Sequence, residues 1–369
     1  MSSRIRVPDH WPNIIQEYKD LGLDIPKVGT AIEDTNLKEV VTAERTLKEE
    51  KIKSRNATSK IDVLNKEIKE YKKIIDTIEN IRTNDVEQIK IRSTSKHSEA
   101  TAVIVASDWH LEERVDPETI AGIDNEYSPT IAQKRAGKFF NEIVNNIRMF
   151  ENKYVIKNAV FAVLGDLISG YIHDELEESN YLSPLEACNE VKKILISGIE
   201  FLKKNTDLEK ITIPCCHGNH GRTQDKKRVS TSWKNSFEYW LYVDLAEKYK
   251  DDERIDIIVT KGYHVYVNVY DYIVRFHHGD NIRYAGGVGG INIPANKAVD
   301  SWNSIRHADL DVFGHFHQLK DDGRFISNGS LIGYNAYALS IKARYEPPQQ
   351  AFFIIDKDYG KTTVAPIRV

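Results

Sequence analysis

The sequence has few cysteines, no long apolar run and no excess of positive charge. Among its 369 residues only Cys188, Cys215 and Cys216 are cysteines, which excludes a disulfide framework. No run of about 18 apolar residues is present and the N-terminus has no apolar signal segment, so we expect a soluble, cytoplasmic protein. The net charge of −4 excludes a basic field over the whole molecule, so nucleic acid could bind only through local patches.

Glycine and proline are absent from Asn36 to Asn84, where lysine, glutamate, isoleucine and asparagine dominate. Apolar residues recur there at alternating spacings of three and four, as in the a/d positions of a coiled coil. We call this set the apolar seam: Ile61, Leu64, Ile68, Tyr71, Ile75 and Ile78. The pattern predicts an amphipathic helix, and we expect a homo-oligomer held through it. Packing against the rest of the chain and binding to another protein are the alternatives.

The length of the chain fits one large α/β domain with an appendage. We expect an N-terminal arm over residues 1–35, a helical, partly coiled-coil segment and linker over 36–98, and an α/β domain over 99–369. The abundance of lysine, isoleucine and asparagine, together with this arm, would suit a phage-like protein or an AT-rich bacterial genome.

The first half of the α/β domain alternates strands with helices. Apolar runs at 158–164 and 211–216 predict strands, and Ser128 and Ser183, each followed by proline, are predicted helix caps. After Tyr263 short alternating runs predict a strand-rich second half. The predicted fold is a two-sheet α/β sandwich flanked by helices, with ligand-bearing loops at the carboxyl ends of the strands.

Asp108 and His110 follow directly after the apolar run 103–106. Side chains at i and i+2 of an extended segment point to the same side, so the two residues could bind one metal ion at the end of a strand. A capping aspartate is the ordinary alternative for so short a motif. Four later stretches also place polar residues after a β-prone run: Gly165-Asp166, Gly218-Asn219-His220, His277-His278-Gly279-Asp280 and Gly314-His315-Phe316-His317.

The ordered series D-x-H, G-D, G-N-H, H-G and G-H-x-H resembles the calcineurin-like metallophosphoesterases, a superfamily of binuclear metal phosphatases, phosphodiesterases and nucleases. The resemblance implies the four-layer fold of that family and a two-metal site at which an activated water attacks phosphorus. It also implies two ligand sets that share one bridging carboxylate. One metal ion would be bound by Asp108, His110, Asp166 and His317, and the other by Asp166, Asn219, His278 and His315.

Carboxylate, amide and imidazole ligands without thiolate suit Mn, Fe, Zn or Ni. We therefore expect two divalent transition-metal ions as cofactors, with Mn favoured. By the resemblance, His220 binds no metal ion and instead stabilises or protonates the leaving oxygen, as a catalytic residue. His277 precedes His278, so either could be the ligand; His278, which is adjacent to Gly279, is favoured.

Some positions depart from the family pattern or stay open. Many members have Asn, Asp or His three residues after the Gly-Asp motif as a partner for the catalytic histidine, whereas this chain has Ser169; His173 or Asp174 could replace that partner. An acidic residue usually follows Gly-Asn-His, whereas this chain has Gly221. His217 is either an ordinary loop residue or a support for the ligands.

Phosphate groups need contacts besides metal ions. We expect substrate-binding residues among the cations that follow the catalytic histidine or precede the glycine-rich stretch 286–290: Arg222, Lys226, Lys227, Arg228 and Arg283. A solvated charged loop is the alternative interpretation of the first four. Asn328-Gly329-Ser330 resembles the turn that closes the site in the family.

Three functions fit these observations. The first is a phosphodiesterase or nuclease acting on DNA or RNA, similar to the double-strand-break repair nucleases of the superfamily. The basic loop and the helical segment favour it, while the acidic net charge and the short region after the core oppose it. The second is a phosphatase acting on a small phosphomonoester, a nucleotide or a phosphoprotein. The third is a coiled-coil scaffold with a weakened site, which the complete ligand set opposes.

Overall fold

The computed structural model describes residues 16, 19–20, 22, 34–83, 97–284 and 290–369. By internal contacts the chain divides into two compact units, Met1–Ser93 and Thr94–Val369. Most of the expected arm over residues 1–35, and residues 84–96 of the expected helical segment and linker, lie outside the described residues. Among the described residues, no helix is both long enough and apolar enough to cross a bilayer.

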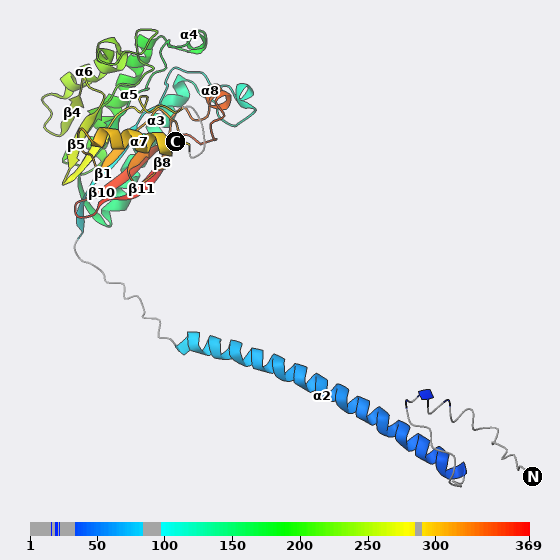
Figure 1. Cartoon of the computed structure of the whole chain (residues 1–369). Helices are drawn as coiled ribbons and strands as arrows, with labels where there is room; N and C mark the ends of the chain where they lie inside the picture. The colour runs from blue at the N-terminus through cyan, green and yellow to red at the C-terminus, as the bar shows by residue number, and fades with distance from the viewer. Residues whose placement is uncertain (1–15, 17–18, 21, 23–33, 84–96, 285–289) are drawn as a thin grey trace, which may run out of the picture. The chain divides into compact units, whose positions relative to one another are not determined.

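The first unit contains one long helix, α2, which has 50 residues from Asp34 to Thr83 and is uninterrupted in Figure 1. Its continuity follows from the absence of glycine and proline, the two residues that most disfavour a helix interior. A helix of this length measures about 75 Å. The predicted N-terminal helix is therefore confirmed, while its pairing as a coiled coil stays a prediction.

The second unit contains a six-stranded sheet in the order β11-β10-β1-β2-β3-β4. Its four parallel strands are β1 (Ser98–Ala106), β2 (Tyr154–Val163), β3 (Lys210–Cys215) and β4 (Ile255–Val259). The antiparallel strands β10 (Gln349–Asp356) and β11 (Gly360–Arg368) extend it on one side. Parallel neighbours need crossover connections, and here helices α3 (Pro129–Glu151), α5 (Pro184–Asn205) and α6 (Phe237–Tyr249) supply them.

A five-stranded sheet has the order β5-β6-β7-β9-β8. Strands β6 (Tyr272–Phe276), β7 (Leu310–Phe313) and β9 (Phe325–Ser327) are parallel, while β5 (Val265–Val269) and β8 (Lys320–Asp321) are antiparallel edges. Helix α7 (Asn292–Asn303) connects β6 to β7. The short helices are η1 (Pro117–Ile120), α4 (Asp174–Ser179), η2 (Ser232–Asn235) and α8 (Ala336–Ser340).

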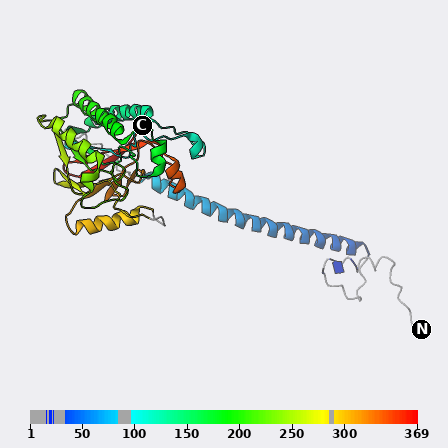
Figure 2. The same cartoon turned by 90° about the horizontal axis from the view of Figure 1, so that it is seen from above.

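The alternation of side chains along β1 shows how the layers pack. Ile104 belongs to the core between the six-stranded sheet and helices α3, α5 and α6, whereas its neighbours Val103 and Val105 belong to the core between the two sheets. A third cluster joins Ala295 of α7 to Phe313 of the second sheet. Figure 2 accordingly shows α7, in gold, on the opposite side of the sheets from the green helices. The predicted two-sheet sandwich flanked by helices is confirmed.

Local predictions hold at the helix starts and fail at some strand limits. The Ser128 hydroxyl accepts a hydrogen bond from the Ile131 amide, and Ser183 forms a capping box with Glu186. Strand β2 begins at Tyr154 rather than at residue 158. Ser98, which the predicted linker included, is the first residue of β1. Pairing of β1 with β2 begins at Ser98 and Tyr154, so β2 includes the apolar residues Tyr154 to Ile156 that precede the predicted start.

Candidate metal centre

The five polar motifs lie after the carboxyl ends of parallel strands in both sheets. Asp108 and His110 follow β1, Asp166 follows β2, and Asn219 and His220 follow β3. From the second sheet, His278 follows β6, and His315 and His317 follow β7. Loops at the carboxyl ends of parallel strands are where α/β folds place their ligands. Four of the seven ligand candidates therefore come from one sheet and three from the other.

Five of these residues have the left-handed backbone conformation that residues other than glycine seldom adopt. Their φ values are 54° for Asp108, 48° for His110, 49° for Asp166, 69° for His315 and 51° for His317. Only eight non-glycine residues in the described part of the chain have a positive φ, so the conformation is concentrated at these loops. Residues held this way cost about 1–3 kcal/mol each and cluster at functional sites.

Three of the four residues in the first ligand set of the sequence prediction are brought together. Donor atoms of Asp108, His110 and His317 lie within 4.8 Å of one another. His110 Nε2 lies 3.2 Å from His317 Nε2, and its Nδ1 lies 2.9 Å from the Ser169 hydroxyl. Burial, followed by the neighbouring His220 and His317 rings, lowers the pKa of His110 well below its ordinary value. A neutral imidazole is the form that binds a metal ion.

The second set meets around the Asp166 carboxylate. Donor atoms of Asp166, His278 and His315 also lie within 4.8 Å of one another. The Asn219 side-chain oxygen lies 3.1 Å from His278 Nε2. Asp166 additionally shares a cluster of the same size with His110 and His220, so it lies between the two sets. This is the position that a bridging carboxylate requires.

The contacts of His278 test whether a metal ion fits. Its Nδ1 lies 2.7 Å from the Leu164 carbonyl oxygen, which can only accept, so Nδ1 carries the proton. Its Nε2 lies 2.9 Å from Asp166 Oδ2 and 3.1 Å from the Asn219 side-chain oxygen. Burial lowers the pKa of His278, but the Asp166 carboxylate outweighs it and raises that pKa to about 10. The two oxygens thus need a positive partner at Nε2, which is either the proton of the ring or a metal ion in its place, and the nitrogen and oxygen donors suit a divalent transition metal.

Buried side chains behind the ligands hold Asp108 in place. Both carboxylate oxygens of Asp108 accept a hydrogen bond from the His315 amide at 3.0 Å, and the Ser107 hydroxyl donates a further one. The Asn328 side-chain amide donates to the Ser107 hydroxyl at 2.9 Å and to the Gln350 oxygen at 3.2 Å. The turn at Asn328 thus supports the site from its far side.

The contacts of His220 identify its partner. His220 Nδ1 lies 3.0 Å from the backbone oxygen of Ser169, so the carbonyl accepts from Nδ1 and fixes the tautomer. The expected substitutes do not take this place, because the His173 ring is 6.1 Å away between centroids and Asp174 begins the exposed helix α4. The Ser169 hydroxyl instead bonds His110 and Glu113. The position that departs from the family pattern therefore serves both histidines.

Two histidines left open by the sequence lie apart from these donor clusters. His277 is buried against the Phe313 ring, stacked at a centroid distance of 5.0 Å, while its Nε2 lies 3.4 Å from Asp311. It therefore faces an aromatic cluster, and His278 faces the site. His217 Nε2 bonds the Ser232 hydroxyl at 3.1 Å, and burial lowers the pKa of His217 to about 4.

The basic loop after His220 is largely held by internal contacts. The Arg222 guanidinium donates to the carbonyls of Asn219, Gln224 and Asp225. Lys227 pairs with Asp280 at 2.5 Å, and Arg228 donates to the Gln224 side chain. These residues, with Lys226, His217 and Asn219, line a pocket beside the second ligand set. Arg283 is exposed and precedes residues 285–289 of the glycine-rich stretch, which lie outside the described residues.

Two buried glutamates at the site gave no sequence signal. Glu112 Oε1 accepts from the Ser169 and Gly170 amides, both at 2.8 Å, and burial raises the pKa of Glu112 to about 8. Glu238 accepts from the Leu167 amide at 2.6 Å and the Gly218 amide at 2.7 Å. Burial, followed by the Asp166 charge, raises the pKa of Glu238 to about 7. Both glutamates accept hydrogen bonds from backbone amides of the loops that carry the ligands, and these contacts between distant residues cannot be read from a local motif.

Comparison with protein-family models and with curated protein sequences finds no match. Among solved structures, the chain is similar to Vacuolar Protein Sorting 29 from Cryptosporidium parvum, with 12% identity, a TM-score of 0.29, and coverage of 72% of this chain and 96% of that one. It is also similar to a conserved uncharacterized protein, a predicted phosphoesterase, from Streptococcus pneumoniae, with 11% identity, a TM-score of 0.26, and coverage of 73% and 98%.

TM-scores this low carry no weight for function. The resemblance to the calcineurin-like metallophosphoesterases depends instead on the order of the five motifs and on the three donor clusters, which share His110 and Asp166.

Proposed function

We propose that this chain is a binuclear metallophosphoesterase that hydrolyses phosphodiester bonds of nucleic acid. The observation that supports this most is that Asp166 belongs to two donor clusters, one with His278 and His315 and the other with His110 and His220. A scaffold would need neither a bridging carboxylate nor strained ligand loops, so the preserved donor set opposes the alternative of a weakened site.

The described side chains would hold two divalent ions in the sets given above. When bound, the ions would lower the pKa of a water molecule and neutralise charge on the phosphoryl oxygens. Only Asp108 and Asp166 among the ligands are carboxylates, so the site stays weakly anionic and a phosphate can approach. His220, oriented through the Ser169 carbonyl, would supply a proton to the leaving oxygen from its other ring nitrogen.

The pocket beside Asn219 supports a diester of nucleic acid over a small monoester. Arg222, Lys226, Lys227 and Arg228 all line it. Asp280 neutralises Lys227, whereas Arg222 and Arg228 bond neutral carbonyl and amide oxygens, so these two guanidinium groups keep their positive charge at the pocket. Phosphate contacts of this kind position a nucleic-acid backbone without reading its sequence. A phosphatase for a phosphomonoester, a nucleotide or a phosphoprotein is the second candidate, because the same donors could bind a terminal phosphate.

An activity panel with Mn²⁺ supplied separates these candidates. We expect hydrolysis of bis-p-nitrophenyl phosphate and of DNA or RNA, and slower hydrolysis of p-nitrophenyl phosphate; cyclic nucleotides complete the panel. Activity on the monoester alone would contradict the diesterase and favour the phosphatase. No turnover of any substrate with Mn, Fe, Zn or Ni, by a chain that binds the metal, would favour the scaffold.

Helix α2 supports a further proposal, a homo-oligomer formed through the apolar seam. The described seam side chains, Ile61, Leu64, Ile68, Tyr71 and Ile75, are each at least 50% exposed. The side chain of Ile78 lies outside the described residues. Fully covering one Ile or Leu contributes about 1.5–3 kcal/mol, so a second copy of the seam would supply stability that the isolated helix lacks.

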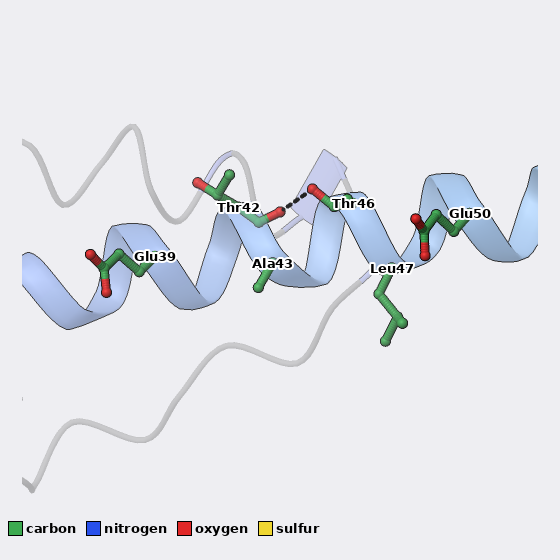
Figure 3. A pocket seen from close by; sticks show the side chains of 6 residues that line it. All are labelled: Glu39, Thr42, Ala43, Thr46, Leu47 and Glu50. Carbon is green, nitrogen blue, oxygen red and sulfur yellow. Dashed lines mark hydrogen bonds between the residues drawn. The ribbon is translucent and has the colours of Figure 1, made fainter.

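Figure 3 shows the same helix upstream of the seam, at a hollow that, among the described residues, is lined by residues of α2. The seam spacing, continued toward the N-terminus, reaches Ala43, Leu47 and Glu50. A small residue and a carboxylate at these positions give a partner helix little to pack against. Pairing should therefore be concentrated between Ile61 and Ile78.

We expect Ile68→Lys to weaken assembly, since it places a charge in the seam, whereas Val63→Lys should not. Val63 is a matched control because it is similarly exposed, at 57% against 50% for Ile68, and lies off the seam. Removal of residues 1–95 should likewise weaken assembly and leave hydrolysis of a small diester near normal. Light scattering measures the outcome: a wild-type chain that is monomeric at micromolar concentration would contradict the oligomer.

A further inference from the structure

Glu238 is a fully buried carboxylate that joins two ligand loops. Its Oε1 accepts from the Leu167 amide at 2.6 Å, and its Oε2 accepts from the Gly218 amide at 2.7 Å. Leu167 is the residue after Asp166, and Gly218 is the residue before Asn219. One side chain therefore fixes the backbone beside the bridging carboxylate and beside an amide ligand of the second set.

Backbone pairing delivers Glu238 to this place. The Phe237 amide donates to the Gly221 carbonyl at 2.8 Å, and the Thr223 amide donates to the Asn235 carbonyl at 2.9 Å. Ser236 then caps α6 by accepting from the Tyr239 amide at 3.2 Å. The segment after His220 thus lies antiparallel to the start of α6, and Glu238 in the first helical turn points beneath both loops.

Gly221 leaves the space that the Glu238 side chain fills. A Cβ on residue 221 would lie 2.9 Å from Glu238 Cγ and 3.3 Å from Cδ. Gly221 is not among the glycines with a positive φ, so its backbone conformation does not require glycine. Glycine is needed at this position because it has no side chain, which leaves room for Glu238. The same position is the one at which the sequence departs from the expected acidic residue.

We propose that Glu238 is a positioning residue of the metal centre, which supplies from helix α6 the carboxylate that residue 221 lacks. The inference rests on the proposed function, because it assumes that the donors bind metal. Glu238 belongs to none of the donor clusters found among the described residues, so it acts through Asp166 and Asn219. Without it, two buried amides would lose their partners and the two loops their common support.

The experiment compares Mn²⁺ binding to full-length wild type, Glu238→Ala and Glu247→Ala by isothermal titration calorimetry. Removing a residue that supports a metal ligand typically lowers metal affinity or activity about 10- to 100-fold. We therefore expect Glu238→Ala to bind Mn²⁺ about 10- to 100-fold more weakly than wild type. Its activity at low Mn²⁺ should fall and should partly return at high Mn²⁺, with little change in KM. Glu247 is exposed in the same helix and pairs with Lys250, so its variant should bind like wild type.

A second variant tests the space at Gly221. The distance from a Cβ at 221 to Glu238 Oε2 is 3.5 Å, which a glutamate side chain can span. The double variant Glu238→Ala with Gly221→Glu should therefore regain most of the Mn²⁺ affinity. A double variant that binds Mn²⁺ as weakly as Glu238→Ala would overturn the inference that Glu238 supplies the carboxylate that residue 221 lacks.

If Glu238→Ala does not fold, Glu238→Gln makes the same comparison, because it keeps the volume and one oxygen acceptor. Wild-type Mn²⁺ affinity in a folded Glu238 variant would overturn the proposal. The measurement is one of binding, so absent hydrolysis in a wild type that binds Mn²⁺ counts against the proposed function alone.

Discussion

Asp166→Ala should lose both metal binding and hydrolysis, because its carboxylate is the donor that the two ligand sets share. It contributes to one cluster with His278 and His315 and to another with His110 and His220. Metal ions supply several kcal/mol of stabilisation to a phosphoryl transition state, so hydrolysis of a small diester should fall by at least about 10³-fold. Elemental analysis should find two metal ions per wild-type chain and fewer than one in the variant.

Two further variants test whether the effect of Asp166→Ala is specific to the charge and the position of Asp166. Asp166→Asn keeps the shape and the acceptor for the His220 amide, which donates to Asp166 Oδ1 at 2.8 Å, so it separates loss of charge from loss of packing. Asp244→Ala removes an exposed aspartate that pairs with Lys192, and it should behave like wild type. The bridging role would be wrong if Asp166→Ala retained two metal ions, and no more than one ion in the active wild type would rule out a binuclear site.

His220→Ala should keep most of the metal and lose most of the rate. A positioned acid or base is typically worth about 10²–10⁴-fold, and His220 is the ring oriented for that task by the Ser169 carbonyl. It is not needed as a ligand, because each set has its own donors. We expect kcat for bis-p-nitrophenyl phosphate to fall by a factor in this range, with Mn²⁺ stoichiometry near two.

His173→Ala is the matched control for His220. His173 is the substitute partner that the sequence suggested, and its ring lies near His220 but makes no hydrogen bond to the donor clusters in the described structure. The variant should therefore stay within a few-fold of wild type. A wild-type rate in His220→Ala would show that His220 has no catalytic role.

Much of the donor set could be predicted because each motif is local. Asp108 and His110 are two residues apart after an apolar run, so the strand that delivers them and the chemistry they offer are read from the same eight residues. The same holds for His315 and His317. Their left-handed backbone was not predicted: aspartate and histidine adopt it more often than most residues, but the sequence argument assumed an extended segment at Asp108 and His110, and the structure shows positive φ at both.

The parts that escaped prediction depend on contacts between distant residues. Glu238 lies 71 positions from Leu167 and is an ordinary glutamate in an aromatic-rich helix until the fold places it under the loops. The loop at Arg222 looked like a free cationic surface, yet its guanidinium bonds the backbone of its own loop.

The division of the donors between two sheets has a consequence for folding. Asp108, His110, Asp166 and Asn219 belong to the six-stranded sheet, and His278, His315 and His317 to the other. Under the proposed metal binding, each ion is a non-covalent cross-link between the layers, and its binding free energy adds to that of the apolar contacts between Val105 and the second sheet. The ligands span the chain from residue 108 to residue 317, so the full set cannot assemble in a fragment that lacks part of this range, and metal binding therefore reports that the two sheets have packed together.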